Sequence, residues 1–215
     1  MTGNPNSELW RVAGVRARQG PVWNFSVAAG AAAWIPDSDD DGLDWLDWLL
    51  GLTTPPEGAV HWQGRDWQAY SPDAASAARG TIGCVLTTGG ALANLDMDEN
   101  VWLPARIHRR TGAAAEIETW ARRFRCWPLP ARRPAVVRER ERQRLLWTRA
   151  FAGRPLALVL ERPLRNMPEE DRRLFLAAVA DVRAAGCAVI WLEETLAEDV
   201  RAALAPLTVI TPEPA

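Results

Sequence analysis

The amino-acid sequence predicts an α/β domain with a mainly parallel core sheet. Short apolar runs alternate along the chain with segments of helical periodicity, which is the order that builds strand–helix–strand units. The run LALVLE at 156–161 is almost entirely apolar, as is typical of a strand buried on both faces. The 215 residues are 48% hydrophobic, enough to form one core, and we find no linker long enough to divide the chain.

The predicted strands are runs of four to seven residues with apolar or alternating character, most of them bounded by turn residues. CAVIWL is a clear example, because Gly186 precedes it at the expected end of a helix. In chain order the predicted strands cover 9–15, 22–28, 31–36, 58–63, 81–86, 156–161, 187–192 and 207–210.

The predicted helices follow from apolar residues at helical spacing and from capping signals. Pro168 is followed by Glu169, Glu170 and Asp171, carboxylates that a helix N-terminus favours. In chain order the predicted helices cover 43–51, 71–79, 96–108, 113–126, 135–152, 169–185 and 195–205.

Composition excludes several function classes. All 25 basic residues are arginine, so no lysine is present to form a Schiff base or to bind phosphate in a P-loop. The three cysteines and two histidines lack zinc or redox spacing, and unpaired thiols suit a reducing cytoplasm. We find neither a signal peptide nor about 18 consecutive apolar residues, so we expect neither secretion nor a membrane span.

The charges are strongly segregated although the net charge is only -2. Residues 106–149 hold 13 Arg against 4 Glu, whereas residues 37–47 hold six Asp. The arginine-rich block is interpreted as solvated surface, with anionic lipid or an acidic partner as the alternative. Nucleic acid is not expected, because the total charge does not favour it.

Four stretches follow one another in a distinctive order. They read VWNFSVAAGAAAWIP with LLGLTTPPEGAVHWQGRD, then IGCVLTTGGALANLDMDENVWLP, then RQRLLWTRAFAGRPLALVLERPL, then the helix 169–185 with CAVIWLEE. Over nearly the whole chain this order resembles the ATP-binding subunits of ABC (ATP-binding cassette) transporters. The pieces GGALANL and ENVWLP are the most specific, and their wording is most similar to cassettes of MCE/Mla-type lipid transporters.

The resemblance implies a P-loop NTPase-like cassette spanning 1–215 as one domain. It implies an N-terminal antiparallel β part and a parallel core sheet, with the core formed by 1–95 and 153–215. The helical subdomain is expected at about 96–152.

The phosphate loop of the family holds nucleotide through backbone amides, a lysine and a magnesium-binding hydroxyl. Here that loop reads PDSDDDGLD, with Gly42 at the lysine position, Leu43 at the hydroxyl position, and Asp41 and Asp44 beside them. Carboxylates repel phosphate. The sequence therefore predicts no cofactor, with neither ATP nor magnesium expected.

The other family positions also depart from the pattern. Thr87 replaces the Q-loop glutamine, Glu161 the magnesium-binding aspartate, Arg162 the catalytic glutamate and Glu193 the switch histidine. The signature sequence is replaced by Val137, Arg138, Glu139, Arg140 and Glu141. We therefore predict a structural or regulatory pseudo-ATPase of a membrane transport complex, with lipid as the expected cargo.

The resemblance also implies partners and a location. We expect a transmembrane transporter subunit, together with a homodimer or a heterodimer with a competent ABC ATPase. The expected location is cytoplasmic, peripheral at the inner face of the membrane.

Two alternatives remain open. In one, the chain is a weak or unconventional ATPase in which Arg162 contacts phosphate. In the other, Asp37, Asp39 and Asp41, which spell DxDxDG with Gly42, form a calcium-responsive module. This second motif is incomplete, because the closing twelfth position is Trp48 rather than glutamate.

Overall fold

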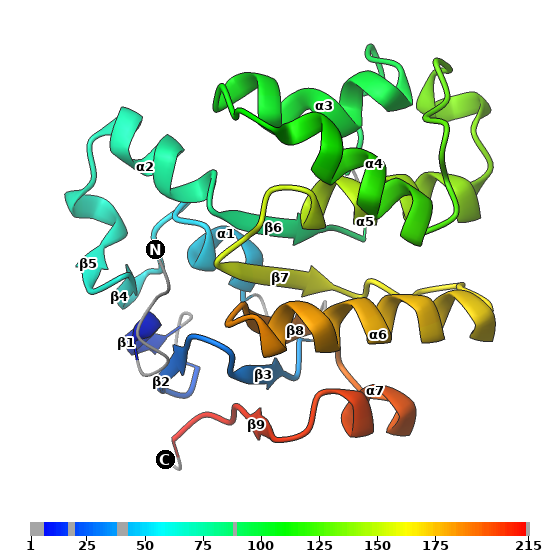
Figure 1. The fold of residues 1–215 in the computed structure, drawn as a ribbon. Coiled ribbons are helices and arrows are strands. Elements are labelled where there is room, and N and C mark those ends of the chain that lie inside the picture. The colour runs from blue at the N-terminus through cyan, green and yellow to red at the C-terminus, as the bar shows by residue number, and fades with distance from the viewer. Residues whose placement is uncertain (1–6, 17–19, 38–42, 88–89, 214–215) are drawn as a thin grey trace.

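A computed structural model of the chain describes residues 7–16, 20–37, 43–87 and 90–213. The parallel sheet predicted from the sequence is present and has the strand order β6-β7-β8-β3-β9 (Figure 1). Every adjacent pair in it is parallel. Its strands are β3 (Ala32–Ile35), β6 (Ile82–Val85), β7 (Ala157–Glu161), β8 (Ala188–Leu192) and β9 (Leu207–Val209).

A second, antiparallel sheet has the order β2-β1-β4-β5, which confirms the expected N-terminal antiparallel part. Strand β1 is its centre and pairs with β2 on one side and β4 on the other. The strands are β1 (Glu8–Arg16), β2 (Trp23–Ala28), β4 (Glu57–Trp62) and β5 (Arg65–Asp66). The two-residue strand β5 was not predicted, because it is too short to show an alternating pattern.

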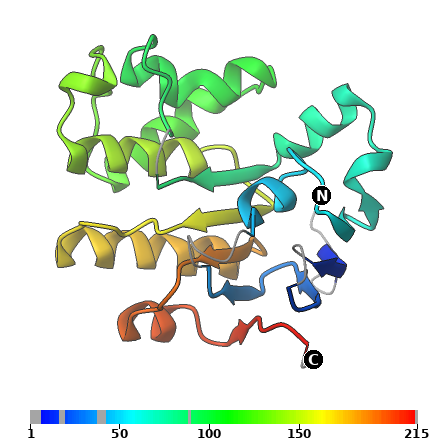
Figure 2. The same ribbon diagram turned by 180° about the vertical axis from the view of Figure 1, so that it is seen from behind.

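Successive side chains along β7 and β8 point to opposite faces of the parallel sheet, which divides the core into two layers. Leu158, Leu160, Val189 and Trp191 pack with the helices that follow β6 and β7. The intervening residues of both strands pack with α1 and the antiparallel sheet. Figures 1 and 2 accordingly show α6 on one face of the parallel sheet and α1 on the other.

The helices lie close to their predicted positions. They are α1 (Trp45–Leu49), α2 (Pro72–Arg79), α3 (Met97–Ile107), α4 (Ala113–Arg123), α5 (Glu139–Phe151), α6 (Glu169–Ala184) and α7 (Glu198–Ala203), with 3-10 turns at Trp67–Ala69 and Pro134–Val136. Within the described ranges, no helix has the length and apolar character needed to cross a bilayer.

The start of α5 corrects a sequence prediction. The helix begins at Glu139 rather than at residue 135, because Pro134 opens a separate 3-10 turn and Val137 after it is extended. Residues 137 and 138 therefore precede the helix, and Arg138 occupies its N-cap position. Apolar periodicity had joined the two segments, although Val136 and Val137 have low helix propensity.

Candidate functional site

Four of the residues predicted at nucleotide positions gather at the carboxyl edge of the parallel sheet, where α/β folds place their sites. Glu161 ends β7 and Arg162 follows it, Glu193 follows β8, and Thr87 lies two residues beyond β6. Strand β7 pairs with both β6 and β8. Glu161 and Glu193 therefore lie at the ends of two neighbouring strands.

Glu161 is bound to the loop that follows β6. Its Oε2 accepts a hydrogen bond of 2.7 Å from the backbone N–H of Thr87, whose hydroxyl donates to the backbone carbonyl of Glu161 at 3.2 Å. Hydrogen bonds to a charged group contribute about 1.5–3 kcal/mol when well formed. This contact thus joins the ends of β6 and β7 and occupies one oxygen of the Glu161 carboxylate.

Glu193 is held by two tryptophans. The Trp191 indole Nε1 donates to its Oε2 at 2.8 Å, and the Trp34 Nε1 donates to its backbone carbonyl at 2.7 Å. The backbone N–H of Glu193 also donates to Ile35 O at 3.4 Å. The residue predicted at the switch position is thus tied to β3 and β8 through both its backbone and its side chain.

Arg162, which directly follows Glu161, has an unusual backbone conformation. Its φ is 41°, a left-handed value that is uncommon for a residue other than glycine. Its N–H donates to Leu192 O at 3.0 Å, and its carbonyl accepts from Arg165 N at 3.1 Å. A guanidinium has no acceptor and stays protonated, so the side chain at this position cannot remove a proton from water.

The predicted phosphate loop is described only at its two ends, because Asp39, Asp41 and Gly42 lie outside the described residues. Leu43 is partly buried against the core next to α1. The backbone carbonyl of Asp44 accepts from Trp48 N at 2.9 Å, and the Asp44 side chain makes no capping bond to the helix. The N–H of Asp37 donates to Glu193 O at 3.3 Å.

The described residues do not by themselves make up a magnesium or calcium site. A hard cation needs about six or more oxygen ligands, yet Leu43 offers no side-chain oxygen and one oxygen of Glu161 is already hydrogen-bonded. Across the described part of the chain, no group of three or more His, Cys, Asp or Glu side chains is placed to hold a metal.

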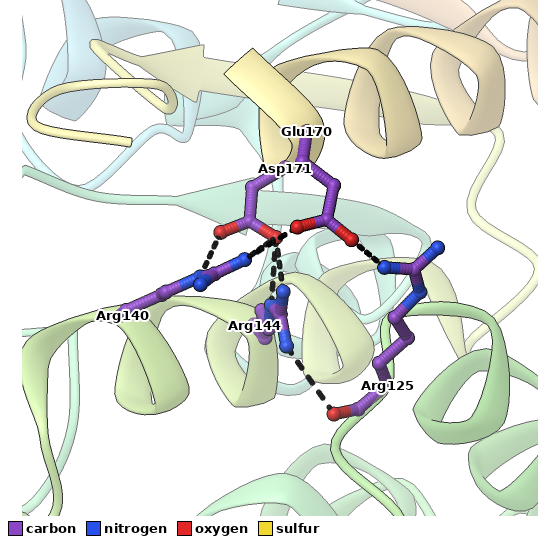
Figure 3. Close-up of polar contacts among 5 residues, drawn as sticks. All are labelled: Arg125, Arg140, Arg144, Glu170 and Asp171. Atoms are coloured by element: carbon purple, nitrogen blue, oxygen red, sulfur yellow. Dashed lines mark hydrogen bonds and ion pairs between the residues drawn. The ribbon is translucent and has the colours of Figure 1, made fainter. Parts of the chain in front are cut away.

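The residues predicted at the signature position contact their own protein. Glu139 accepts a bond of 3.5 Å from Asn166 Nδ2, and Glu141 pairs with Arg132 at 3.0 Å. Arg140 points across to α6 (Figure 3), where its Nη2 lies 3.2 Å from Asp171 Oδ1 and its Nε donates to Oδ2. This segment therefore connects two helices of the same chain.

Asp171 is the centre of a charge cluster that sequence reasoning did not find (Figure 3). Its side chain has no exposed surface, and it accepts from Arg140 and from Arg144, whose Nε lies 2.9 Å away. Burial raises the pKa of Asp171, but the hydrogen bonds and charges of the two arginines outweigh it and hold the pKa below its usual range. Neighbouring Glu170 pairs with Arg125 and Arg140.

A sequence signal for this cluster was present. Asp171, Phe175 and Ala178 are spaced at i, i+4 and i+7, which places them on one face of a helix, and all three are buried. A carboxylate on the buried face of a helix requires a cationic partner. At the level of sequence, Asp171 is apparent only as the third carboxylate at the helix N-terminus.

No protein-family model matches the chain. Over 163 residues, covering 74% of this chain and 72% of the relative, the chain is 22% identical to the lipoprotein-releasing system ATP-binding protein LolD of Buchnera aphidicola subsp. Acyrthosiphon pisum (strain APS). Among the solved structures that are similar to this chain, two illustrate the match.

One is the ATP-binding cassette MJ0796 as a post-hydrolysis dimer bound to ADP and Pi, with a TM-score of 0.76 at 16% identity, covering 87% of this chain and 88% of that one. The other is an ATP-binding subunit of an ABC transporter, with a TM-score of 0.75 at 19% identity, covering 87% of this chain and 80% of that one.

These similarities overturn one expectation. The prediction that neither ATP nor magnesium binds is contradicted, because the similar proteins are ATP-binding cassettes and one of them is described with bound ADP and Pi. The prediction counted aspartates along the sequence between 37 and 44, whereas repulsion depends on where each carboxylate lies relative to phosphate. The two sheets, their strand orders and the similarity to solved cassettes together show that the chain has the ABC ATPase cassette fold.

Proposed function

We propose that this chain is an ABC-type subunit of a membrane transport complex and that it contributes structure or regulation rather than ATP turnover. In this proposal residues 1–95 and 153–215 form the cassette core and residues 96–152 the helical subdomain. The subunit works at the cytoplasmic face of the membrane with a transmembrane partner, as a dimer with itself or with a competent ABC ATPase.

The replacement of a carboxylate by Arg162 carries the proposal. Hydrolysis needs a group that accepts a proton from the attacking water or orients it, and a guanidinium has no acceptor atom. At Glu193, one carboxylate oxygen accepts a hydrogen bond from Trp191 Nε1 at 2.8 Å, which fixes the orientation of this side chain. ATP binding is compatible with this proposal, since binding depends on phosphate contacts and not on a base.

Lipid or lipid-modified cargo is the finer part of the proposal. It is supported by the similarity of residues 82–104 to cassettes of lipid transporters. The name of the relative LolD, an ATP-binding protein of a lipoprotein-releasing system, also supports it. Reconstitution with the membrane subunit and a labelled lipid tests this part separately from ATP turnover.

Phosphate release from magnesium-ATP tests the central claim. We expect the purified chain to release no more phosphate than its Glu161→Gln variant, in which the carboxylate that ends β7 is neutralised. The Arg162→Ala variant is expected to behave in the same way. Binding of a fluorescent ATP analogue, measured in parallel, shows whether nucleotide reaches the protein.

One outcome favours the alternative of an unconventional ATPase. Turnover above background that falls on replacing either Glu161 or Arg162 would show that this edge of the sheet supports hydrolysis. It would contradict a purely structural or regulatory role. Turnover that neither substitution changes would indicate a contaminating ATPase. Repeating the assay on further purified protein would then remove this activity.

A further inference from the structure

Helices α3, α4 and α5 pack together on one side of the parallel sheet (Figure 1), and two of their loops border a surface cleft of about 510 Å³. The loop between α3 and α4 contributes residues 109–112, and the loop between α5 and β7 contributes residues 152–154. The first turn of α4 completes the wall. Three arginines line this cleft, namely Arg109 and Arg110 from the first loop and Arg154 from the second.

The lining carries more positive than negative charge. Among the described residues that line the cleft only Glu116 is acidic, and Arg154 Nε donates to its Oε1 at 2.8 Å. Arg110 donates to Gly153 O at 2.6 Å, an acceptor without formal charge. Within the described part of the chain, no carboxylate lies within ion-pair distance of Arg109 or Arg110. Three arginines against one glutamate therefore leave a net formal charge of +2.

Other arginines of the same block are compensated. Arg122, Arg123, Arg132 and Arg144 each pair with a carboxylate of this chain. The sequence showed an excess of arginine over 106–149 but did not show where arginines would remain without a counter-charge. The structure places two of them side by side in sequence at this cleft.

One of the two uncompensated arginines is partly withdrawn from water. Burial lowers the pKa of Arg110 below the usual range of an arginine, because a guanidinium loses hydration there. An anion that reaches Arg110 replaces part of this lost hydration with charge-assisted hydrogen bonds. The exposed Arg109 adds a second cationic group to the same wall.

The uncharged part of the lining indicates the kind of anion. It consists of Thr111, Gly112, Ala113, Ala152 and Gly153, so it offers a hydroxyl but no large apolar side chain against which a peptide anchor could pack. Gly112 is the N-cap of the 11-residue helix α4 and provides no side-chain cap, which leaves the positive end of the helix uncapped next to the arginines. A phosphate group accepts several hydrogen bonds at once and suits such a set of donors.

We propose that this cleft binds a phosphate group, either on the headgroup of an anionic lipid or as free phosphate. Arg109 and Arg110 neutralise its charge, Thr111 donates a hydrogen bond to it, and Arg154 compensates Glu116. This inference goes beyond the proposed function and does not depend on it. The cleft lies before the amino-terminal end of β7, whereas the predicted nucleotide positions lie at the carboxyl edge of the sheet.

Two probes distinguish the sources of the phosphate. Isothermal titration of the full chain with inorganic phosphate measures binding of the free anion. Cosedimentation with vesicles of phosphatidylglycerol and phosphatidylcholine measures binding of the lipid headgroup, with vesicles of phosphatidylcholine alone as the neutral control. Binding of inorganic phosphate alone would assign the cleft to the free anion, and binding of the anionic vesicles would assign it to lipid.

Arg109 and Arg106 provide a matched pair of variants. Both side chains are exposed, and neither has a carboxylate within ion-pair distance among the described residues, but only Arg109 lines the cleft. Arg109→Gln should weaken binding of the anionic probe at least about five-fold, which corresponds to about 1 kcal/mol. Arg106→Gln should weaken it less than about two-fold.

A third variant tests the opposite wall. Arg154→Gln leaves the Glu116 carboxylate without its partner in the cleft, so we expect weaker binding of the anionic probe. The Arg154 side chain is 83% exposed, and its replacement should therefore leave the protein folded, as circular dichroism would verify.

Several results would overturn the proposal. The first is that wild type binds neither inorganic phosphate nor the anionic vesicles. The second is an equal loss of binding in Arg109→Gln and Arg106→Gln, which would indicate general attraction to a basic surface. The third is binding that neither Arg109→Gln nor Arg154→Gln weakens. None of these measurements uses nucleotide, so failure here and failure of the turnover assay remain distinguishable.

Discussion

Replacing Asp171 by asparagine should destabilise the protein strongly. The substitution keeps the shape of the side chain and one acceptor oxygen, but it removes the negative charge that two arginines share. Arg144, which has only 14% of its side chain exposed, is then left as a nearly buried cation. Its remaining acceptors, the Asn oxygen and the backbone carbonyl of Arg125 at 3.4 Å, carry no formal charge.

The magnitude follows from the burial of the partners. Removing one member of a buried ion pair costs about 3–5 kcal/mol. We expect the lower end here, about 3 kcal/mol, because the Arg140 side chain is 47% exposed and can be rehydrated. For a chain of this size such a loss lowers the melting temperature by roughly 6–12 °C.

Urea unfolding at pH 7 measures this loss, with Glu170→Gln as the matched control. Glu170 is adjacent in sequence and also pairs with arginines, but it is 55% exposed, so its neutralisation should cost less than about 1 kcal/mol. A double-mutant cycle of Asp171→Asn with Arg144→Met should show a coupling energy above about 1 kcal/mol. Equal effects of the two neutralising variants, or a coupling energy near zero, would refute this reasoning.

Two further predictions concern titratable groups. Because the pKa of Asp171 in the folded protein lies below its usual value, its stabilisation is present above the unfolded-state pKa of about 3.9 and is lost as pH falls through the folded-state value. The stability difference between wild type and Asp171→Asn should therefore be constant from about pH 5 to 7 and shrink below about pH 4; a difference unchanged at lower pH argues against it. Burial raises the pKa of Cys84 and Cys187 to about 12 and that of Cys126 to about 11. At pH 8 no more than about one thiol in a thousand is then ionised, and the thiolate is the reactive form. Mass spectrometry should therefore find the native protein unmodified by iodoacetamide. The denatured protein should be modified at all three cysteines.

Much of the fold was predictable from short-range patterns. The apolar runs at 156–161 and 187–192 became β7 and β8, and the predicted helix at 169–185 became α6. The same patterns placed Glu161 at the end of one predicted strand and Glu193 directly after another, whereas the pairing of these two strands came from the structure. The start of α5 was placed too early, because apolar periodicity continues through residues 135–137, whereas the structure has a 3-10 turn from Pro134 and an extended Val137 there.

The partners of the charged and polar groups were decided by the tertiary structure. Thr87 and Glu161 are 74 residues apart in the sequence, and Asp171 is 31 and 27 residues from Arg140 and Arg144. In the same way, the cleft beside α4 receives Arg109 and Arg110 from one loop and Arg154 from another.

The sequence alone determined the alternation of strands and helices and the absence of lysine. It also determined that carboxylates stand where predicted strands end. Backbone preference and apolar periodicity act between near neighbours and can be inferred along the chain. The pairing of each arginine depends on its distance from a carboxylate. Those distances join segments that meet only when both core layers pack. Only the folded structure therefore supplies them.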